Sequence, residues 1–395
     1  PVSTLEQVLQ GAVPGLNIAA TGSSGQPGES YSVNIRGLGS LANSAGGASF
    51  TLGAPYVLVD GVPMNLNDVD PNNVKSISVL KDAASTAIYG ARAAYGVILI
   101  TTKSGSDSPG MKVSYSYNYA MAQPTTFPRQ VDALNFALIL DSAAVNTGIA
   151  LPFSDEAIDR IRQYMKDPEN TPGVVPNSAG TGWDFTGSGL GANANTDWYD
   201  ALFRKNAIRQ THNLSISGSG RNVNYALSAG YFHEDGLSRY ASEQYTRKTL
   251  SGKLEATPLN WLKVGLITKY VGSDDSYPWD ISADGRNFFM NRVSRNAPTL
   301  PLKNPSGGFL SASGINSGQN ERENRNTAQW VLSPSVKLEP VKNWVTTLQY
   351  NYTYTNYTQT DIANTFYQLQ PDSSKSFGLN QSQTKYIANT STTTY

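Results

Sequence analysis

The amino-acid sequence predicts a mainly β fold, a transmembrane antiparallel β-barrel that follows a small α+β domain. The first observation is a period of two: from residue 111 onward, apolar residues alternate with polar ones in segment after segment. The second is composition, because charged residues make up only 15% of the chain while tyrosine numbers 22. This composition suits strands with one face in lipid and the other in a wet lumen. The third is a regular alternation of short and long connections.

The composition also excludes several classes of protein. The chain has 395 residues with 30 basic and 30 acidic side chains, so its net charge is zero. It has no basic stripe of the kind that binds nucleic acid. No run approaches the ~18 apolar residues that a membrane helix needs. Cysteine is absent, which removes a thiolate nucleophile or a thiolate metal site. On composition alone, a secreted β-sandwich or solenoid remains the alternative.

The first domain has mixed helix and strand signals. Ser3 and Glu6 fit the capping box of a short amino-terminal helix. Asp60 and Gly61 form a strong turn signal. Residues 97–102 are apolar on both faces and predict a strand buried on both sides. Further strands are predicted at 16–18, 31–36, 55–59 and 74–80, with a short helix at 81–87. We take residues 1–105 as this domain.

Residues 106–395 carry the alternating pattern and are predicted to form the first part of the barrel. Trp344, Leu348 and Tyr350, for example, share one face, opposite Thr347 and Gln349. The predicted strands are roughly eight and cover residues 111–121, 207–218, 222–233, 244–256, 261–271, 327–338, 344–356 and 381–395.

The connections between these strands indicate a topology. Three are tight, at 219–221, 257–260 and 339–343, and two are very long, at 122–206 and 272–326. Outer-membrane barrels sort their connections in this way, with short periplasmic turns and long extracellular loops. The first strand is therefore predicted to run outward, which puts the preceding domain in the periplasm or the lumen.

The lumen of the barrel must be wide enough to hold the first domain, which requires more strands than this chain has. A sheet edge cannot stay open in hydrocarbon, so a membrane sheet must close. Eight strands leave a lumen just wide enough for side chains, whereas barrels of about 22 strands hold a plug. We therefore expect this chain to be the first part of a barrel of about 22 strands. The complete polypeptide should be far larger than the 42.5 kDa of this chain.

Several motifs resemble one known family. They stand at residues 34–37 (Asn-Ile-Arg-Gly), 59–63 (Val-Asp-Gly-Val-Pro), 78–92 and 96–103, and they resemble the plug domain of SusC/RagA-type TonB-dependent outer-membrane transporters. Residues 197–203 and 212–218 resemble this family's early barrel. The resemblance covers most of residues 1–272. Tyr95 stands where the family often has Asn before a glycine, which leaves the type of that turn open.

The resemblance implies active transport across the outer membrane of a Gram-negative bacterium of the Bacteroidetes type. TonB would supply energy by pulling a motif upstream of the plug, and a SusD-like surface lipoprotein would capture an oligosaccharide or peptide. Outer-membrane lipid would surround the barrel, and a dimer of transporter–lipoprotein pairs is compatible with the resemblance. The alternatives are a passive porin-like channel and a surface adhesin or binding protein, neither of which needs a plug.

The plug motifs supply the candidate gating residues. Arg36 and Arg92 are expected to form ion pairs with Asp60 and Asp82, within the plug or to the barrel wall, in a structural role. The full gating set is Arg36, Gly37, Asp60, Gly61, Asp82, Gly90, Arg92 and Gly96. Residues 1–103 are expected to move or partly unfold during transport. Within them, 22–28 and 41–53 should be the least stable part.

Ligand contacts are expected from aromatic side chains at the outer mouth, which could stack on sugar rings or peptide groups. The alternative is that they pack within their own loops. The candidates are Phe50, Trp183, Phe185, Tyr277 and Trp279. No enzyme is predicted, because His212 and His233 lack a second ligand at metal-binding spacing and no dinucleotide fingerprint appears. We therefore predict neither a metal nor a cofactor.

Overall fold

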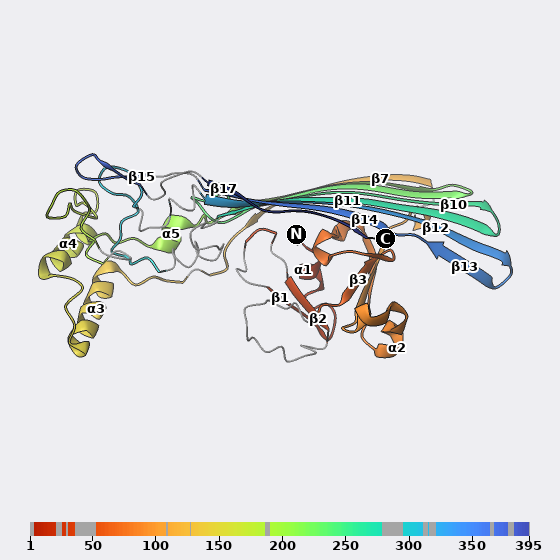
Figure 1. Ribbon diagram of the computed structural model, residues 1–395, viewed down its shortest axis with the longest axis horizontal. Coiled ribbons are helices and arrows are strands. Elements are labelled where there is room, and N and C mark those ends of the chain that lie inside the picture. The colour runs from red at the N-terminus through yellow and green to blue at the C-terminus, as the bar shows by residue number, and fades with distance from the viewer. Residues whose placement is uncertain are drawn as a thin grey trace.

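The computed structural model describes residues 4–20, 26–28, 31–35, 53–107, 110–126, 128–185, 190–278, 295–310, 315, 321–363, 367–377 and 383–394. Figure 1 shows one long sheet from the middle of the molecule to its right-hand end, with a small domain below it. A cluster of loops and helices lies at one end of the sheet.

The long sheet is an antiparallel meander of nine strands. Its order is β17-β14-β12-β11-β10-β9-β8-β7, and β13 also pairs with β12. The strands are β7 (Gly110–Ala122), β8 (Ala207–Ser219), β9 (Val223–Asp235), β10 (Gln244–Leu259), β11 (Leu262–Pro278), β12 (Glu321–Val341), β13 (Trp344–Gln349), β14 (Tyr352–Ala363) and β17 (Gln383–Thr394). All the predicted barrel strands are confirmed, and β13 and β14 together cover the segment predicted at 344–356.

One predicted connection is shorter than expected. The sequence predicted a loop over 272–326, but β11 and β12 stay paired as far as Pro278 and Arg322, so the connection spans 279–320. The extension was not predicted because the residues at this end of both strands are polar and interrupt the apolar alternation of the rest of the strands.

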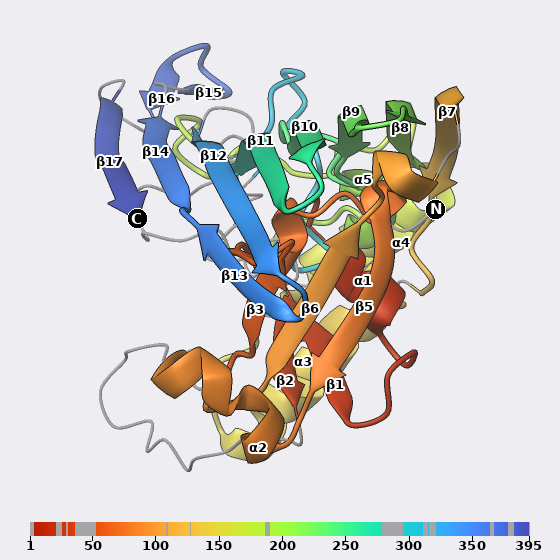
Figure 2. The ribbon, with the colours of Figure 1, turned by 90° about the vertical axis from the view of Figure 1, so that its right-hand side faces the viewer.

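The sheet has one apolar outer face and one inner face against the small domain. Met111 and Tyr115 on the outer face are 74% and 63% exposed, whereas Val271 and Val331 on the inner face are 6% and 2% exposed. Figure 2, seen along the strands, shows the sheet arching over the small domain. Period-two alternation therefore separates a membrane-type face from a face that packs on protein.

The small domain holds two sheets. β1 (Leu16–Ala20) and β2 (Tyr31–Ile35) form a hairpin, and the mixed four-stranded sheet has the order β4-β3-β6-β5. Its strands are β3 (Tyr56–Val59), β4 (Val62–Pro63), β5 (Val74–Leu80) and β6 (Val97–Thr102). The short helices are α1 (Leu5–Leu9), α2 (Ala83–Thr86) and the 3-10 turns η1 (Leu66–Asp68), η2 (Pro71–Asn73), η3 (Ala87–Ala93) and η4 (Gly105–Asp107). The predicted strands and helices of this domain are confirmed.

Two details of the first domain differ from prediction. Thr4, not Ser3, caps α1 by accepting a hydrogen bond from the Gln7 backbone N–H. The helix therefore begins at Leu5, and its apolar residues Leu5 and Leu9 are buried in the core. The predicted burial of β6 is confirmed, because Val97 and Ile98 are fully buried.

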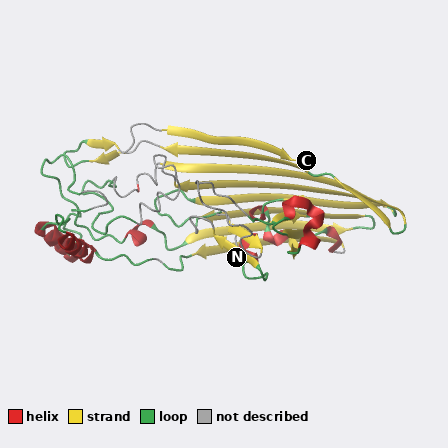
Figure 3. Ribbon diagram, turned by 60° about the horizontal axis from the view of Figure 1, so that its bottom comes forward, coloured by secondary structure: helices red, strands yellow, loops and turns green. Residues whose placement is uncertain are grey.

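The end with the long connections forms a helical and loop region of its own. α3 (Ala133–Thr147), α4 (Asp155–Lys166) and α5 (Trp198–Leu202) all lie between β7 and β8, and β15 (Tyr367–Leu369) pairs with β16 (Lys375–Phe377). Figure 3 shows these helices beyond one end of the strands, with the short turns at the opposite end. None of the helices that the structure describes is long and apolar enough to cross a membrane.

Candidate functional site

The Asp60-Gly61 turn brings the small domain into contact with the sheet. It joins β3 to β4 with positive φ angles of 54° and 84°, the backbone of a type I′ hairpin turn. The Asp60 carboxylate accepts hydrogen bonds from the Thr102 backbone N–H at 3.0 Å and from its hydroxyl at 2.7 Å. The end of β6 therefore fixes the carboxylate in place.

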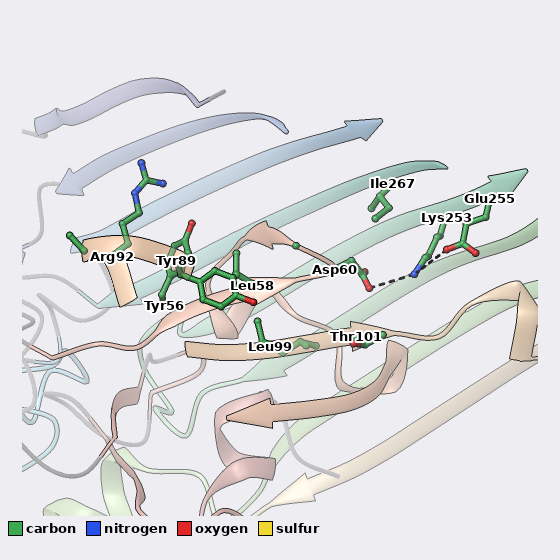
Figure 4. Close-up of a pocket in the computed structure, with 13 residues that line it drawn as sticks. Tyr56, Leu58, Asp60, Tyr89, Arg92, Leu99, Thr101, Lys253, Glu255 and Ile267 are labelled. Atoms are coloured by element: carbon green, nitrogen blue, oxygen red, sulfur yellow. Dashed lines mark ion pairs between the residues drawn. The ribbon is translucent and has the colours of Figure 1, made fainter. Parts of the chain in front are cut away.

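Two lysines of the sheet meet this carboxylate. Lys269 Nζ on β11 lies 3.2 Å from Asp60 Oδ2, and Lys253 Nζ on β10 lies 3.7 Å from Oδ1. The side chains of Asp60 and Lys269 are only 4% and 8% exposed. Figure 4 shows Lys253 between Asp60 and Glu255, with which it also forms an ion pair. The small domain is thus tied to the inner wall by a buried charge cluster.

The lysines control the protonation of Asp60. Burial by itself raises the pKa of the Asp60 carboxyl. The charges of Lys269 and Lys253 and the hydrogen bonds from Thr102 outweigh burial, and they lower the pKa below its ordinary value. The carboxylate is therefore charged at neutral pH, and removing either side of the cluster would strand a buried charge.

Further contacts hold the segment 26–28 to the wall. The Tyr277 hydroxyl on β11 donates a hydrogen bond of 2.6 Å to the Pro27 carbonyl. A Cβ on Gly28 would lie 2.3 Å from the Tyr245 ring on β10, so this glycine lets the two backbones approach. The sequence predicted low stability for the loop over 22–28, and this stays a prediction, although wall residues contact its described part at 26–28. Residues 41–52 of the other predicted loop lie outside the described residues.

A cavity of about 810 Å³ opens between the Asp60 turn, η3 and the wall. Tyr56, Tyr89 and Arg92 line it from the small domain, and Lys253 and Glu255 from β10. Within the described part of the chain, Arg92 forms no ion pair. The cavity is therefore lined by two phenol rings, an arginine, a lysine and two carboxylates.

The remaining candidate gating residues shape the backbone. Asp82 stands at the N-cap of α2, and its carbonyl accepts a hydrogen bond from the Ser85 hydroxyl. Gly90 has a φ of 66° and separates the turns on either side of it. Gly96 has a φ of 97° in the turn before β6, and Tyr95 keeps a negative φ, so this turn is not of type I′. Arg36 and Gly37 lie outside the described residues.

The aromatic candidates for ligand contact are buried, partly buried or outside the described residues. Trp183 is 9% exposed and packs in a loop core, with Phe185 against it. Tyr277 is 2% exposed and serves the contact with Pro27. Phe50 and Trp279 lie outside the described residues. The placement of Trp183 and Tyr277 matches the packing alternative, and ligand contact by these side chains stays a prediction.

Sequence reasoning missed Lys253 and Lys269. Both occupy inward positions of strands whose outward positions carry Leu254, Leu266 and Tyr270. A lysine on the face opposite an apolar stripe was the available signal. The partner of these lysines could not be predicted from the sequence, because the contact depends on where the small domain lies against the sheet.

The chain is similar to known TonB-dependent receptors. Residues 1–97 match the model of the TonB-dependent Receptor Plug Domain. TonB-dependent receptor P26 of Formosa agariphila is 29% identical over 78% of this chain and 26% of its own length. TonB-dependent receptor SusC of Bacteroides thetaiotaomicron is 27% identical over 69% of this chain and 23% of its own length. The chain therefore spans about a quarter of the length of these curated relatives.

A solved structure shows the same fold. The structure of the RagAB peptide transporter matches with a TM-score of 0.69 and 23% identity, over 92% of this chain and 40% of that chain. The plug match, the curated relatives and this fold agree with the motifs at 34–37, 59–63, 78–92 and 96–103. Residues 1–97 are therefore the plug domain of a TonB-dependent receptor, and over most of its length the chain is similar to TonB-dependent receptors such as SusC.

Proposed function

We propose that the chain serves the TonB-dependent import of a large nutrient, an oligosaccharide or a peptide, across the outer membrane of a Gram-negative bacterium of the Bacteroidetes type. The observation that carries the proposal is the buried cluster of Asp60, Lys269 and Lys253, which ties a separate plug to the inner wall of a sheet with an apolar outer face. A plug held in a lumen blocks passage, so import needs a step that releases it.

In this proposal residues 1–105 are the plug and residues 106–395 the first part of the barrel. Release would break the contacts of Asp60 and of residues 26–28 with the wall, and the cavity beside Arg92 would widen into the passage. The glycines at 61, 90 and 96 would keep the plug folded between cycles, together with Asp82 at the start of α2. Trp183, Phe185 and Tyr277 would act by holding the outer loops and the plug in position.

The partners follow from the likeness to relatives. TonB would deliver the force that releases the plug, and a SusD-like lipoprotein would hand the nutrient to the outer mouth. SusC is by name a TonB-dependent receptor, and the RagAB complex is described as a peptide importer. The likeness to the RagAB importer supports a peptide as the nutrient, and an oligosaccharide is the alternative that the sequence motifs suggest.

Uptake by living cells tests the proposal. Cells that produce the complete transporter would receive fluorescent pools of oligopeptides or oligosaccharides, with and without a protonophore that removes the energy for TonB. We expect one pool to accumulate in energised cells only, and to bind the surface of uncoupled cells without entering. Accumulation that ignores the protonophore would indicate a passive porin, and binding without accumulation in either state would indicate an adhesin.

A further inference from the structure

The outer face of the sheet carries a row of aromatic side chains. Backbone pairing places Tyr270, Trp330 and Tyr354 side by side on β11, β12 and β14. The rings of Tyr270 and Trp330 have centroids 4.4 Å apart, and Trp330 is 51% exposed. Toward the short turns the same face is apolar, with Leu266 and Leu332 exposed. Such a row marks the boundary between hydrocarbon and headgroups in membrane barrels.

The spacing of aromatic residues supports this boundary. Trp344 is 65% exposed near the short-turn end, and Tyr354 follows ten positions later. At about 3.3 Å per residue and a tilt of roughly 40°, the two lie about 25 Å apart along the membrane normal. This equals the height of about 25 Å expected for the apolar band of a membrane barrel. The row through Tyr270 therefore lies at the headgroups on the side of the long loops.

A groove lies directly above this row. The next row of paired residues is Lys248, Gly272, Ala328 and Asn356, and its two central members are small. They leave a cavity of about 170 Å³ lined by Lys248, Tyr270, Gly272, Asp274, Asn326, Thr327, Ala328, Asn356 and Thr358. An added Cβ on Gly272 would lie 2.5 Å from the Tyr270 hydroxyl oxygen, so this glycine gives the hydroxyl its place beside the groove.

The groove combines the groups that recognise a sugar with one that recognises an anion. The Asp274 carboxylate and the amides of Asn326 and Asn356 can hydrogen-bond hydroxyls, and the rings below can pack against a sugar face. Lys248 Nζ lies 3.3 Å from Asp274 Oδ2, and both side chains are about half exposed, at 55% and 53%. An incoming ligand can therefore reach both charges.

We propose that this groove binds the sugar headgroup of a glycolipid of the outer leaflet. The hydroxyls lie against Asp274, Asn326 and Asn356, and an acidic substituent of the sugar lies at Lys248. The acyl chains then descend over the aromatic row onto exposed leucines such as Leu250 and Leu332. The site faces away from the plug, so it is separate from the import path. The inference rests on the outer-membrane location proposed above, but not on the identity of the nutrient.

Lipid retention tests the site. The complete transporter, stripped of lipid in detergent, would enter nanodiscs of phosphatidylethanolamine that contain a small fraction of lipid A, a phosphorylated diglucosamine glycolipid. Native mass spectrometry then counts the lipid that stays bound after the disc is removed. Lys248→Gln removes the cation, and Ala328→Leu fills the groove without a change of charge. Lys342→Gln, in an exposed short turn at the other end of the strands, is the matched control.

We expect wild type and Lys342→Gln to retain lipid A in preference to phosphatidylethanolamine. Lys248→Gln and Ala328→Leu should each retain at least about tenfold less, while still running as folded barrels on unheated gels. Equal retention by all four proteins would overturn the site. Displacement of lipid A by inorganic phosphate, or by the free phosphorylated disaccharide at equal concentration, would overturn the assignment to a membrane lipid. Cell fractionation and the uptake assay report separately on location and import.

Discussion

Gly96 illustrates how one residue fixes the backbone of the plug. Its φ is 97°, and a Cβ at this position would lie 2.7 Å from Ile35 Cδ1 and 3.0 Å from the Leu80 carbonyl oxygen. Gly90 also has a positive φ, of 66°, but a Cβ there would meet no atom within 4 Å. The two glycines therefore separate the effect of backbone strain from the effect of a steric clash.

We predict that Gly96→Ala lowers the local free energy of unfolding of the plug by about 2–4 kcal/mol, since strain adds to a clash with backbone. Gly90→Ala should lower it by only about 1 kcal/mol, since strain acts alone. Hydrogen exchange of the β6 amides in the complete transporter measures both. Equal protection in the two variants would show that the contact of Gly96 with Ile35 and Leu80 does not matter.

Asp60 shows how a charge holds the plug to the wall. Asp60→Asn leaves Lys269 buried without its counter-charge, and we expect it to weaken the plug–wall contact by about 3 kcal/mol. Faster hydrogen exchange in β3 and β4 would report the loss. Asp159→Asn, which breaks the exposed pair with Arg162, is the matched control and should change exchange little. Unchanged exchange in Asp60→Asn would show that the charge cluster does not hold the plug to the wall.

The pH dependence of this contact has a definite sign. Because folding lowers the pKa of Asp60, its contribution to stability is fully present above the ordinary carboxyl pKa of about 4. It is lost as the pH falls through the lowered value of the folded state. Wild type should therefore hold the plug equally well between pH 5 and pH 8, in round numbers, and release it more easily in stronger acid, whereas Asp60→Asn should lack this acid-dependent part.

The strands were predictable because each carries its own pattern. Apolar alternation over 207–218 or 222–233 needs no knowledge of the rest of the chain. Helices α3 and α4 were missed although their caps are local signals. Ser154 accepts a hydrogen bond from the Ala157 N–H at the start of α4, and Gly148 ends α3 in the left-handed conformation. The ion pair between Asp60 and Lys269 could not be predicted from the sequence, because the two residues meet only when the small domain docks against the sheet.

At the scale of elements, the long and short connections should lie on opposite sides of the membrane. Ser142 is exposed on α3 in the long β7–β8 connection, and Asn222 is exposed in the short turn before β9. The chain has no cysteine, so a single introduced thiol gives a clean signal. We predict that Ser142→Cys reacts with an impermeant maleimide on whole cells and that Asn222→Cys reacts only after lysis. The reverse pattern would invert the topology.

At the scale of the molecule, plug and wall share one hydrophobic core. Val271 of β11 and Val331 of β12 pack with Leu66, Val69 and Ile98 of the plug. The wall therefore stabilises the plug by apolar contact as well as by charge. Transport that passes through the lumen must disturb this shared core, so the central claim of the account is that the plug has to leave the wall.

A disulfide can prevent that movement. A Cβ on Gly28 would lie 2.5 Å from Tyr245 Cγ, which is one bond of about 1.5 Å from Tyr245 Cβ. The two Cβ atoms therefore lie at most about 4 Å apart, close enough for a disulfide to join them after a small shift of the backbones. Gly28→Cys combined with Tyr245→Cys would lock residue 28 of the plug to β10. The reduced double variant and Tyr245→Cys alone control for the substitutions, because Gly28→Cys alone would place its Cβ 2.3 Å from the Tyr245 ring.

Uptake of the imported fluorescent pool by energised cells that produce this double variant is the most direct measurement. We expect oxidised cells to bind the pool at their surface without accumulating it, and we expect a reductant to restore accumulation. Tyr245→Cys alone should import in either state. Accumulation at the same rate in oxidised and reduced cells, with the crosslink verified as complete, would contradict this expectation and make the plug a static element beside a permanent channel.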